Sequence, residues 1–213
     1  MSAGSGHKAY QRKYRYEVTI LGKSAHAGTT PMALRVDPGV AASRIQLKLR
    51  ELGRSGRHGA ERRATMGVTR FEPGLVNVVP NRVVCSVDIR HPEESKLEGA
   101  LEELLAFYRA VAAEEKLTLT HRETARTPPV PFSDKVQQLV AKAAAARGLA
   151  HQAIVSGAGH DCQELARLCP TAMVFVPGEY DGISHNPREY STPEQCASGV
   201  NVMLQLALDL AEE

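Results

Sequence analysis

The 213-residue chain contains no tryptophan, and aromatic residues make up only 5% of it. Leucine, valine, isoleucine and alanine must therefore fill most of any core, and a hydrophobic content of 43% is sufficient for one at this length. No apolar run approaches the roughly 20 residues that a membrane helix needs. The composition predicts one globular domain or two small ones, with no membrane partner.

Neither sign of charge is in clear excess. The 26 basic and 24 acidic residues give a formal net charge of +2. This near balance argues against nucleic acid as a partner. The one basic run, Arg54–Arg63, places arginines among glycine and serine, a pattern that predicts a solvated loop.

Cysteine is also scarce. The four cysteines form no Cys-x-x-Cys pair, and the small, polar start Met1–Gly6 has no apolar segment typical of a signal peptide. These features predict free thiols in a reducing compartment, with the cytoplasm as the expected location and an organelle as the alternative.

Hydrophobic periodicity predicts the order strand, helix, strand, strand, helix, strand in the first part of the chain. The strands are expected at residues 14–23, 65–71, 82–90 and 117–121, and the helices at 37–52 and 93–113. Asp37 and Pro38 suit the N-cap and the first position of the earlier helix. This order is the split βαβ, ferredoxin-like pattern, and it fills residues 12–125.

A proline-rich stretch, Thr127–Pro131, predicts an extended connector to a second region at residues 126–213. That region is expected to contain a helix at 133–147, a glycine-rich turn at 156–160 opening a helix, a strand at 171–176 and a final helix at 192–211. The apolar run at 171–176 is typical of a strand covered on both faces. Because few strands accompany it, the second region is expected to be part of a larger sheet.

Two polar segments of the first region could carry chemistry. His26 stands among small residues in Ser24–Met32, where an imidazole can approach a ligand and donate a hydrogen bond. Asn77 and Arg90 stand at opposite ends of a loop and a strand, and arginine suits bidentate binding of a carboxylate. By residue type alone, a surface-loop histidine is the better explanation of His26, and an exposed arginine paired with Asp88 or a neighbour explains Arg90 at least as well.

Two further polar segments lie in the second region. Glycines in Ser156–Asp161 would expose backbone N–H groups toward an anion at a helix N-terminus, although a simple tight turn explains them as well. His185 follows the buried strand and is well placed to bind a metal, although a lone histidine is more often not a ligand. The chain has no P-loop, G-x-S-x-G, H-E-x-x-H or dinucleotide motif.

Taken together and in order, the segments HAGTTPM, NVVP, DIR, SGAGHD and GISHNPRE resemble the dimeric amidohydrolases related to zinc aminopeptidases. This group includes N-carbamoyl-L-amino-acid hydrolases, β-ureidopropionases and allantoate amidohydrolases. The resemblance covers the chain from about Tyr14 onward. It implies an α/β protein with a ferredoxin-like βαββαβ lid and dimerisation domain at 12–125, followed by the C-terminal part of a catalytic domain at 126–213.

The resemblance also implies roles for residues of the lid. His26 would reach the active site of the neighbouring subunit in a homodimer and polarise the scissile carbonyl. Asn77 and Arg90 would bind the carboxylate of a small-molecule substrate from the lid side.

In the second region, the resemblance implies that Gly159 and His160 contact the substrate and that His185 is the last metal ligand. The family chemistry uses two zinc-type ions, with Mn²⁺, Co²⁺ or Ni²⁺ as alternatives to Zn²⁺, to activate water for attack on a ureido carbonyl. The other metal ligands and a general-base glutamate belong to an N-terminal half that has no counterpart here, so this chain alone is not expected to be competent.

Three interpretations follow. The chain works with a complementary N-terminal chain or half, or it is a shortened homologue used as a structural dimerisation subunit. In the third, it is a relic that binds an amino-acid-like carboxylate through Asn77 and Arg90. The site residues retained together favour the first. N-carbamoyl-L-amino acids are the favoured substrates, and allantoate is the alternative.

Overall fold

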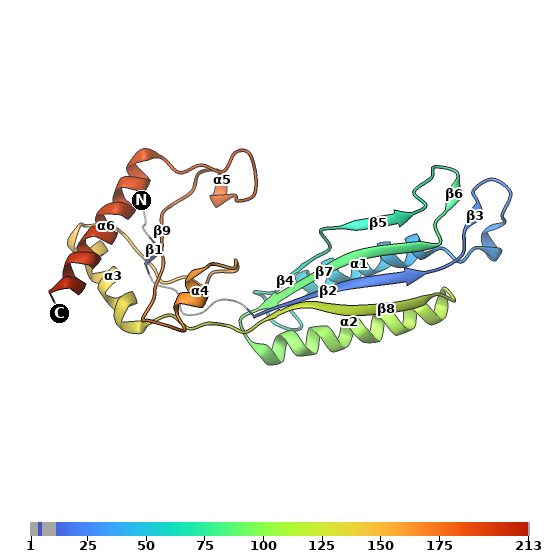
Figure 1. The fold of residues 1–213 in the computed structure, drawn as a ribbon, viewed down its shortest axis with the longest axis horizontal. Coiled ribbons are helices and arrows are strands. Elements are labelled where there is room, and N and C mark those ends of the chain that lie inside the picture. Colours follow the sequence, from blue (N-terminus) through green and yellow to red (C-terminus); the bar gives the residue numbers. More distant parts are fainter. Residues whose placement is uncertain (1–3, 6–11, 213) are drawn as a thin grey trace. The chain divides into compact units, whose positions relative to one another are not determined.

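The computed structural model describes residues 4–5 and 12–212, which fall into two compact units (Figure 1). One unit is Arg12–Pro128. The other begins at Pro129 and also contains strand β1 (Gly4–Ser5). None of the described helices combines the length and the apolar character that crossing a membrane requires.

The first unit is built on an antiparallel sheet in the order β4-β7-β2-β8, with β5 also paired to β7. Strand β2 (Arg12–Leu21) lies between β7 (Arg82–His91) and β8 (Thr118–Thr127) and is antiparallel to both. Helices α1 (Pro38–Arg54) and α2 (Glu94–Glu114) connect the strands (Figure 1). This strand order is ferredoxin-like, and it confirms the fold predicted from the hydrophobic pattern.

Alternation along the two central strands builds the core of this unit. The inward residues of β2 and β7 and one face of each helix form a single buried cluster. Its strand members are Tyr14, Tyr16, Val18, Ile20, Val83, Cys85, Val87 and Ile89. As predicted, Asp37 caps α1 by accepting a hydrogen bond from the Gly39 backbone N–H at 2.8 Å, with Pro38 at the helix start.

The edge of the sheet differs from the prediction of one strand at 65–71. It consists of β4 (Arg63–Thr65) and β5 (Thr69–Glu72), both paired to β7. Thr65 lies opposite Asp88 and Thr69 opposite Cys85, so the edge carries one extra residue at this point. The side chain of Ser86 accepts a hydrogen bond from the Val68 N–H at 3.0 Å, which satisfies the interrupted ladder.

The basic run Arg54–Arg63 is only partly the solvated loop that its composition predicts. Arg62 is 2% exposed, and its guanidinium donates to the Leu52 carbonyl at the end of α1 at 2.6 Å. That carbonyl is one of the last in the helix, where backbone carbonyls lack intrahelical donors, and it accepts from Arg62 as well as from the Ser55 hydroxyl at 3.4 Å. Arg57 and Lys48 pair with Glu103 of α2, and the hydrogen bond from Lys48 contributes most to lowering the pKa of Glu103 to about 2.

The side chain of His91, at the end of β7, is also buried, with 1% of the residue exposed. Its Nδ1 accepts a hydrogen bond from the Glu93 N–H at 2.9 Å. Gly59 packs so closely that a Cβ there would lie 2.3 Å from Nε2. Burial lowers the pKa of His91 below its ordinary value. His91 therefore binds a proton less readily in the folded chain than in the unfolded chain.

We expect this histidine to make the first unit sensitive to mild acid. Its contribution is fully present above the unfolded pKa of about 6.5 and is lost as the pH falls toward the lower folded value. One such group changes the free energy of unfolding by at most about 1.4 kcal/mol per pH unit in that window. Denaturant unfolding between pH 7.5 and 5.5 measures the slope, and His91→Gln should flatten it. An unchanged slope in the variant would contradict this assignment.

The second unit pairs α3 (Asp134–Ala146) with α6 (Pro193–Ala211) over a small core of Val140, Ala143, Ala144 and Val202. Its sheet consists of β1 and β9 (Val174–Phe175). The apolar run at 171–176 is only half-buried, contrary to the prediction of a strand covered on both faces, because one short strand pairs with it in the described residues. Apolar residues of α6 remain exposed: Val200, Met203, Leu204 and Leu208.

Candidate functional site

His26 and Asn77, distant in the sequence, lie together at one end of the first unit. Strand β3 (Ala25–His26) pairs with β6 (Val78–Val79), which places His26 opposite Val78. The Ala27 N–H donates to the Asn77 carbonyl at 2.9 Å. We call this region the tip; it comprises residues 24–35 and 73–81, around β3 and β6 in Figure 1.

The loop that carries His26 is held by its own hydrogen bonds. The Nδ1 atom of His26 accepts from the backbone N–H groups of Gly28 at 3.0 Å and Thr29 at 3.2 Å. Arg35 donates to the carbonyls of Thr30 at 3.0 Å and Ala27 at 2.7 Å. These contacts, which the sequence did not reveal, set the ring position while the side chain remains exposed.

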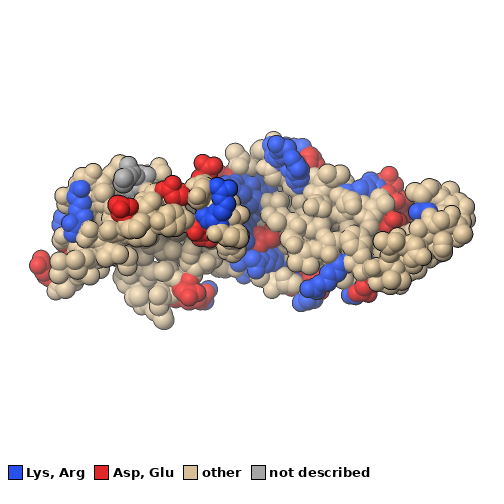
Figure 2. All heavy atoms as spheres, turned by 90° about the horizontal axis from the view of Figure 1, so that it is seen from above, with Lys and Arg blue, Asp and Glu red and all other residues tan. Residues whose placement is uncertain are grey.

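The surface of the tip is apolar and almost free of charge. In the sequence of the tip, Arg35 is the one charged residue among Lys, Arg, Asp and Glu. The corresponding end of the unit is mostly tan in Figure 2. Its exposed apolar side chains are Met32, Leu34, Leu75 and Val76. Exposed apolar patches of this kind mark interaction sites.

Arg90 lies at the other end of β7. Its Nε and Nη2 atoms donate to the two carboxylate oxygens of Asp88 at 2.7 and 2.9 Å, and Arg15 donates to the same carboxylate at 2.7 Å. Burial opposes ionisation of Asp88, but the hydrogen bonds from Arg90 and Arg15 outweigh it and lower the pKa. The pairing with Asp88 orients the guanidinium, and a substrate carboxylate would have to share or displace that partner.

The length of β7 separates Arg90 from the tip. The tip leads into β7 at Arg82, and at about 3.3 Å per residue the step from Arg82 to Arg90 is roughly 26 Å. A single small carboxylate cannot span that length. Within one chain, Asn77 and Arg90 therefore cannot bind the same carboxylate, although the sequence predicts that they share one.

In the second unit, Ser156 and His160 are joined by a hydrogen bond of 2.8 Å between Oγ and Nε2. The His160 N–H donates to the side chain of Gln163 at 3.1 Å, and the His160 ring packs edge-on against Phe175. Gln163 is buried and was not singled out in the sequence. Gly159 is exposed beside His160. The helix expected after this turn is only α4 (Cys162–Leu165), too short to give the turn a strong helix dipole.

His185 lies on an exposed loop that follows the short α5 (Glu179–Gly182). Its φ of 56° is in the left-handed region, as are those of Tyr180 and Asp181. Such conformations cost roughly 1–3 kcal/mol in non-glycine residues and concentrate at functional sites. The His185 N–H donates to Glu189 at 2.9 Å.

The donors of the described residues do not fit a two-metal centre. No group of three or more His, Cys, Asp or Glu side chains in that part of the chain is placed to hold a metal ion. A structural or catalytic zinc ion needs three or four protein ligands, and His185 supplies one imidazole. Any such centre must draw its remaining ligands from elsewhere.

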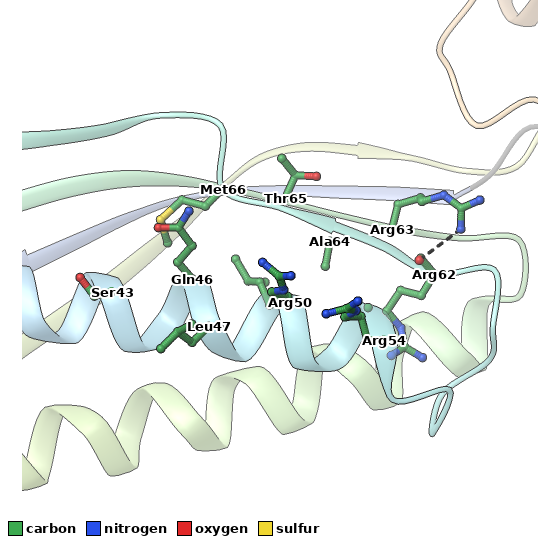
Figure 3. Close-up of a pocket in the computed structure, with 12 residues that line it drawn as sticks. Ser43, Gln46, Leu47, Arg50, Arg54, Arg62, Arg63, Ala64, Thr65 and Met66 are labelled. Carbon is green, nitrogen blue, oxygen red and sulfur yellow. Dashed lines mark hydrogen bonds between the residues drawn. The ribbon is translucent and has the colours of Figure 1, made fainter. Parts of the chain in front are cut away.

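A hollow of about 650 Å³ lies between α1 and β4, beside the edge of the sheet. Arg50, Arg54 and Met66 are among the residues that line it, and Figure 3 shows Arg50 directed from α1 into the space below the strand. None of the residues predicted to act on substrate lines this hollow. It is therefore not the candidate active site.

The chain belongs to peptidase family M20/M25/M40, whose model matches residues 6–209. Enzymes of this family are generally metal-dependent. The family resemblance and the fold class predicted from the sequence are thus confirmed.

Relatives of known activity are amidohydrolases. The chain is 38% identical over 197 residues to an allantoate amidohydrolase of Bacillus subtilis (strain 168), covering 92% of this chain and 47% of the relative. It is 34% identical over 196 residues to an N-carbamoyl-L-amino-acid amidohydrolase of Rhizobium meliloti, covering 92% and 46%. The chain thus spans about half the length of these curated relatives.

A solved amidase of the hydantoinase/carbamoylase family from Burkholderia multivorans has a similar structure. The TM-score is 0.85 at 39% identity, with 97% of this chain and 49% of that chain covered. The similarity extends over both units of the chain.

Proposed function

We propose that the chain is the substrate-gripping part of a metal-dependent amidohydrolase that cleaves the ureido C–N bond of N-carbamoyl-L-amino acids. The observation that carries the proposal is the tip, where His26 and Asn77 are held together on an exposed surface with little charge. The first unit, Arg12–Pro128, would act as the lid, and the unit that begins at Pro129 would belong to the catalytic domain.

The residues of this chain would act on the two ends of the substrate. Addition of water to the ureido carbonyl turns the carbonyl oxygen into an oxyanion, and His26 would donate a hydrogen bond to it. Collapse of this intermediate breaks the C–N bond, and the amino-acid nitrogen leaves with a proton. The carbamic acid that remains decomposes to carbon dioxide and ammonia. Arg90 would hold the carboxylate, while Gly159 and His160 would contact the substrate and His185 would bind one metal ion.

The separation of the tip from Arg90 favours a site shared by two copies of the chain. Strand β4 begins beside Arg90, because Arg63 lies opposite it, and β5 leads toward the tip. If a second copy pairs along this edge about a twofold axis near Val68, each tip lies toward the Arg90 end of the other copy. One active site would then combine His26 and Asn77 of one protomer with Arg90 of its partner.

The surface of that edge supports such a homodimer. All four residues of β5 are exposed. Val68 and Phe71 on the edge, and Val40 and Leu47 on α1, are exposed apolar side chains. An open edge strand with apolar neighbours is a template for pairing with another strand, which natural proteins usually cover.

The second unit has apolar surfaces that a complementary half of the catalytic domain would cover. The apolar face of α6 and the half-buried strand β9 would be covered by further sheet and helices, carried by the same protein or by another chain. That half would bring the missing metal ligands and the general base.

Two alternatives remain in the proposal. The absence of a metal-ligand group from the described residues favours a non-catalytic dimerisation subunit as the second candidate function. Allantoate is the alternative substrate, supported by the 38% identity to an allantoate amidohydrolase. Both substrates carry a carboxylate and a ureido carbonyl, so Arg90 and His26 would suit either.

The test is made on the native protein, meaning the chain or assembly that contains this sequence in its own cell. It is purified through a C-terminal tag and assayed for ammonia release from N-carbamoyl-L-amino acids and from allantoate, before and after removal of metal by a chelator. We expect hydrolysis that the chelator abolishes and added Zn²⁺ or Mn²⁺ restores. A stable, metal-supplemented assembly that hydrolyses neither substrate would overturn the proposal and favour the dimerisation subunit.

A further inference from the structure

The two hydrogen bonds received by His26 restrict where its proton lies. Backbone N–H groups can only donate, and those of Gly28 and Thr29 both point at Nδ1, at 3.0 and 3.2 Å. A neutral imidazole accepts at one nitrogen and donates at the other. Nδ1 is therefore the acceptor, and the proton of the neutral ring is on Nε2.

The loop keeps this arrangement without any ligand. The Thr30 N–H donates to the His26 carbonyl at 3.1 Å, which closes the turn that brings the Gly28 and Thr29 amides over the ring. The Arg35 guanidinium donates hydrogen bonds to the Thr30 and Ala27 carbonyls and so links the two sides of the turn. Strand pairing between β3 and β6 holds the base of the loop. The ring and its donors are thus preorganised.

We infer that the Gly28–Thr29 turn sets the tautomer of the neutral His26 ring, with the proton on Nε2, so that Nε2 donates a hydrogen bond and does not accept a proton. The inference rests on the proposed function and deepens it. In hydrolysis, the Nε2–H would be aimed at the carbonyl oxygen where negative charge develops. His26 could not take a proton from the attacking water, so the general base must be another group. Gly28 and Thr29 would be positioning residues that act through their backbone.

The chain offers an internal contrast at His151. There Nδ1 lies 3.1 Å from the Leu149 carbonyl, which can only accept, so the proton is expected on Nδ1. Both histidines are exposed, and their neutral rings should show opposite tautomers in one sample.

Nitrogen-15 NMR of the histidine side chains tests the inference on this 213-residue chain without substrate or metal. The His26 signals are assigned by their loss in His26→Gln. We expect an unprotonated Nδ1 and a protonated Nε2, with through-hydrogen-bond coupling from Nδ1 to the amide nitrogens of Gly28 and Thr29. Because a free histidine samples both tautomers, the coupling is the decisive signal. Averaged ring signals without coupling would overturn the inference.

A pair of variants tests whether the Gly28–Thr29 turn sets the His26 tautomer. Thr29→Pro removes one of the two N–H donors, and Gly28 before it tolerates a following proline. Thr29→Ala keeps both donors. We expect Thr29→Pro to increase the Nδ1–H population severalfold and to lose one coupling, while Thr29→Ala matches the unmodified chain. A ring unaffected by Thr29→Pro would contradict control by the turn. Neither outcome depends on whether the native protein hydrolyses a ureido substrate, so failure here is distinguishable from failure of the proposed function.

Discussion

Mixed dimers of a His26→Ala protomer and an Arg90→Ala protomer are expected to recover activity that neither variant has alone. Loss of an oxyanion donor typically lowers the rate by about 10²–10³-fold. Loss of an arginine that pairs with a carboxylate costs about 2–5 kcal/mol, which corresponds to roughly 30-fold to 5,000-fold. In a heterodimer, one shared site keeps both His26 and Arg90. Random assortment of a 1:1 mixture should restore about a quarter of the unmodified activity in an isologous dimer.

A matched control uses two changes on the same tip. His26→Ala mixed with Asn77→Ala leaves one defect in each shared site, so no recovery is expected. The measurement is ammonia release by the native protein after the variants are exchanged and remixed. If His26→Ala and Arg90→Ala fail to complement while each folds and dimerises, both residues act within one protomer, and the site is not shared across the edge.

Val68→Lys is expected to dissociate the dimer. Val68 is 46% exposed at the interruption between β4 and β5, close to the proposed twofold axis. A lysine there would face its own copy across the axis, and like charges in an interface cost several kcal/mol. We expect the dissociation constant to rise by about 10²-fold or more. Analytical ultracentrifugation of this chain measures it, and the native protein should lose its hydrolytic activity in parallel.

Thr120→Lys provides the comparison on the opposite edge. Thr120 is an exposed residue of β8 and pairs only with β2, so the same new charge lies away from the proposed interface. We expect this variant to remain dimeric, and both variants to keep the circular dichroism of the unmodified chain. A dimer that survives Val68→Lys but not Thr120→Lys would place the interface at β8 instead.

The elements that could be predicted from the sequence are those in which side chains face a single environment. Inward residues of β2 and β7 alternate because every second one enters the core. The start of α1 could also be predicted, because the capping contacts of Asp37 and Pro38 involve residues next to them in the sequence. The family motifs were readable too, because each is a short contiguous segment.

The extent of β8 could not be predicted. Its expected range was 117–121, whereas it continues to Thr127. The added residues are mostly exposed and carry no hydrophobic alternation. They are held in the strand by pairing with β2. The hydrophobic periodicity of a single segment does not show which other strand it pairs with. Arg62 is a second case, since it is buried against the Leu52 carbonyl at the end of α1, a contact that depends on where the helix ends.

By itself the sequence determined the ferredoxin-like order of elements, the membership of an amidohydrolase family and the identity of the candidate site residues. Only the tertiary structure decided which of those residues meet. It brings His26 and Asn77 together through β3 and β6, and it separates both from Arg90 by the length of β7. The physical reason is that a motif specifies residue types over a few positions, whereas proximity between motifs is set by strand pairing and strand length.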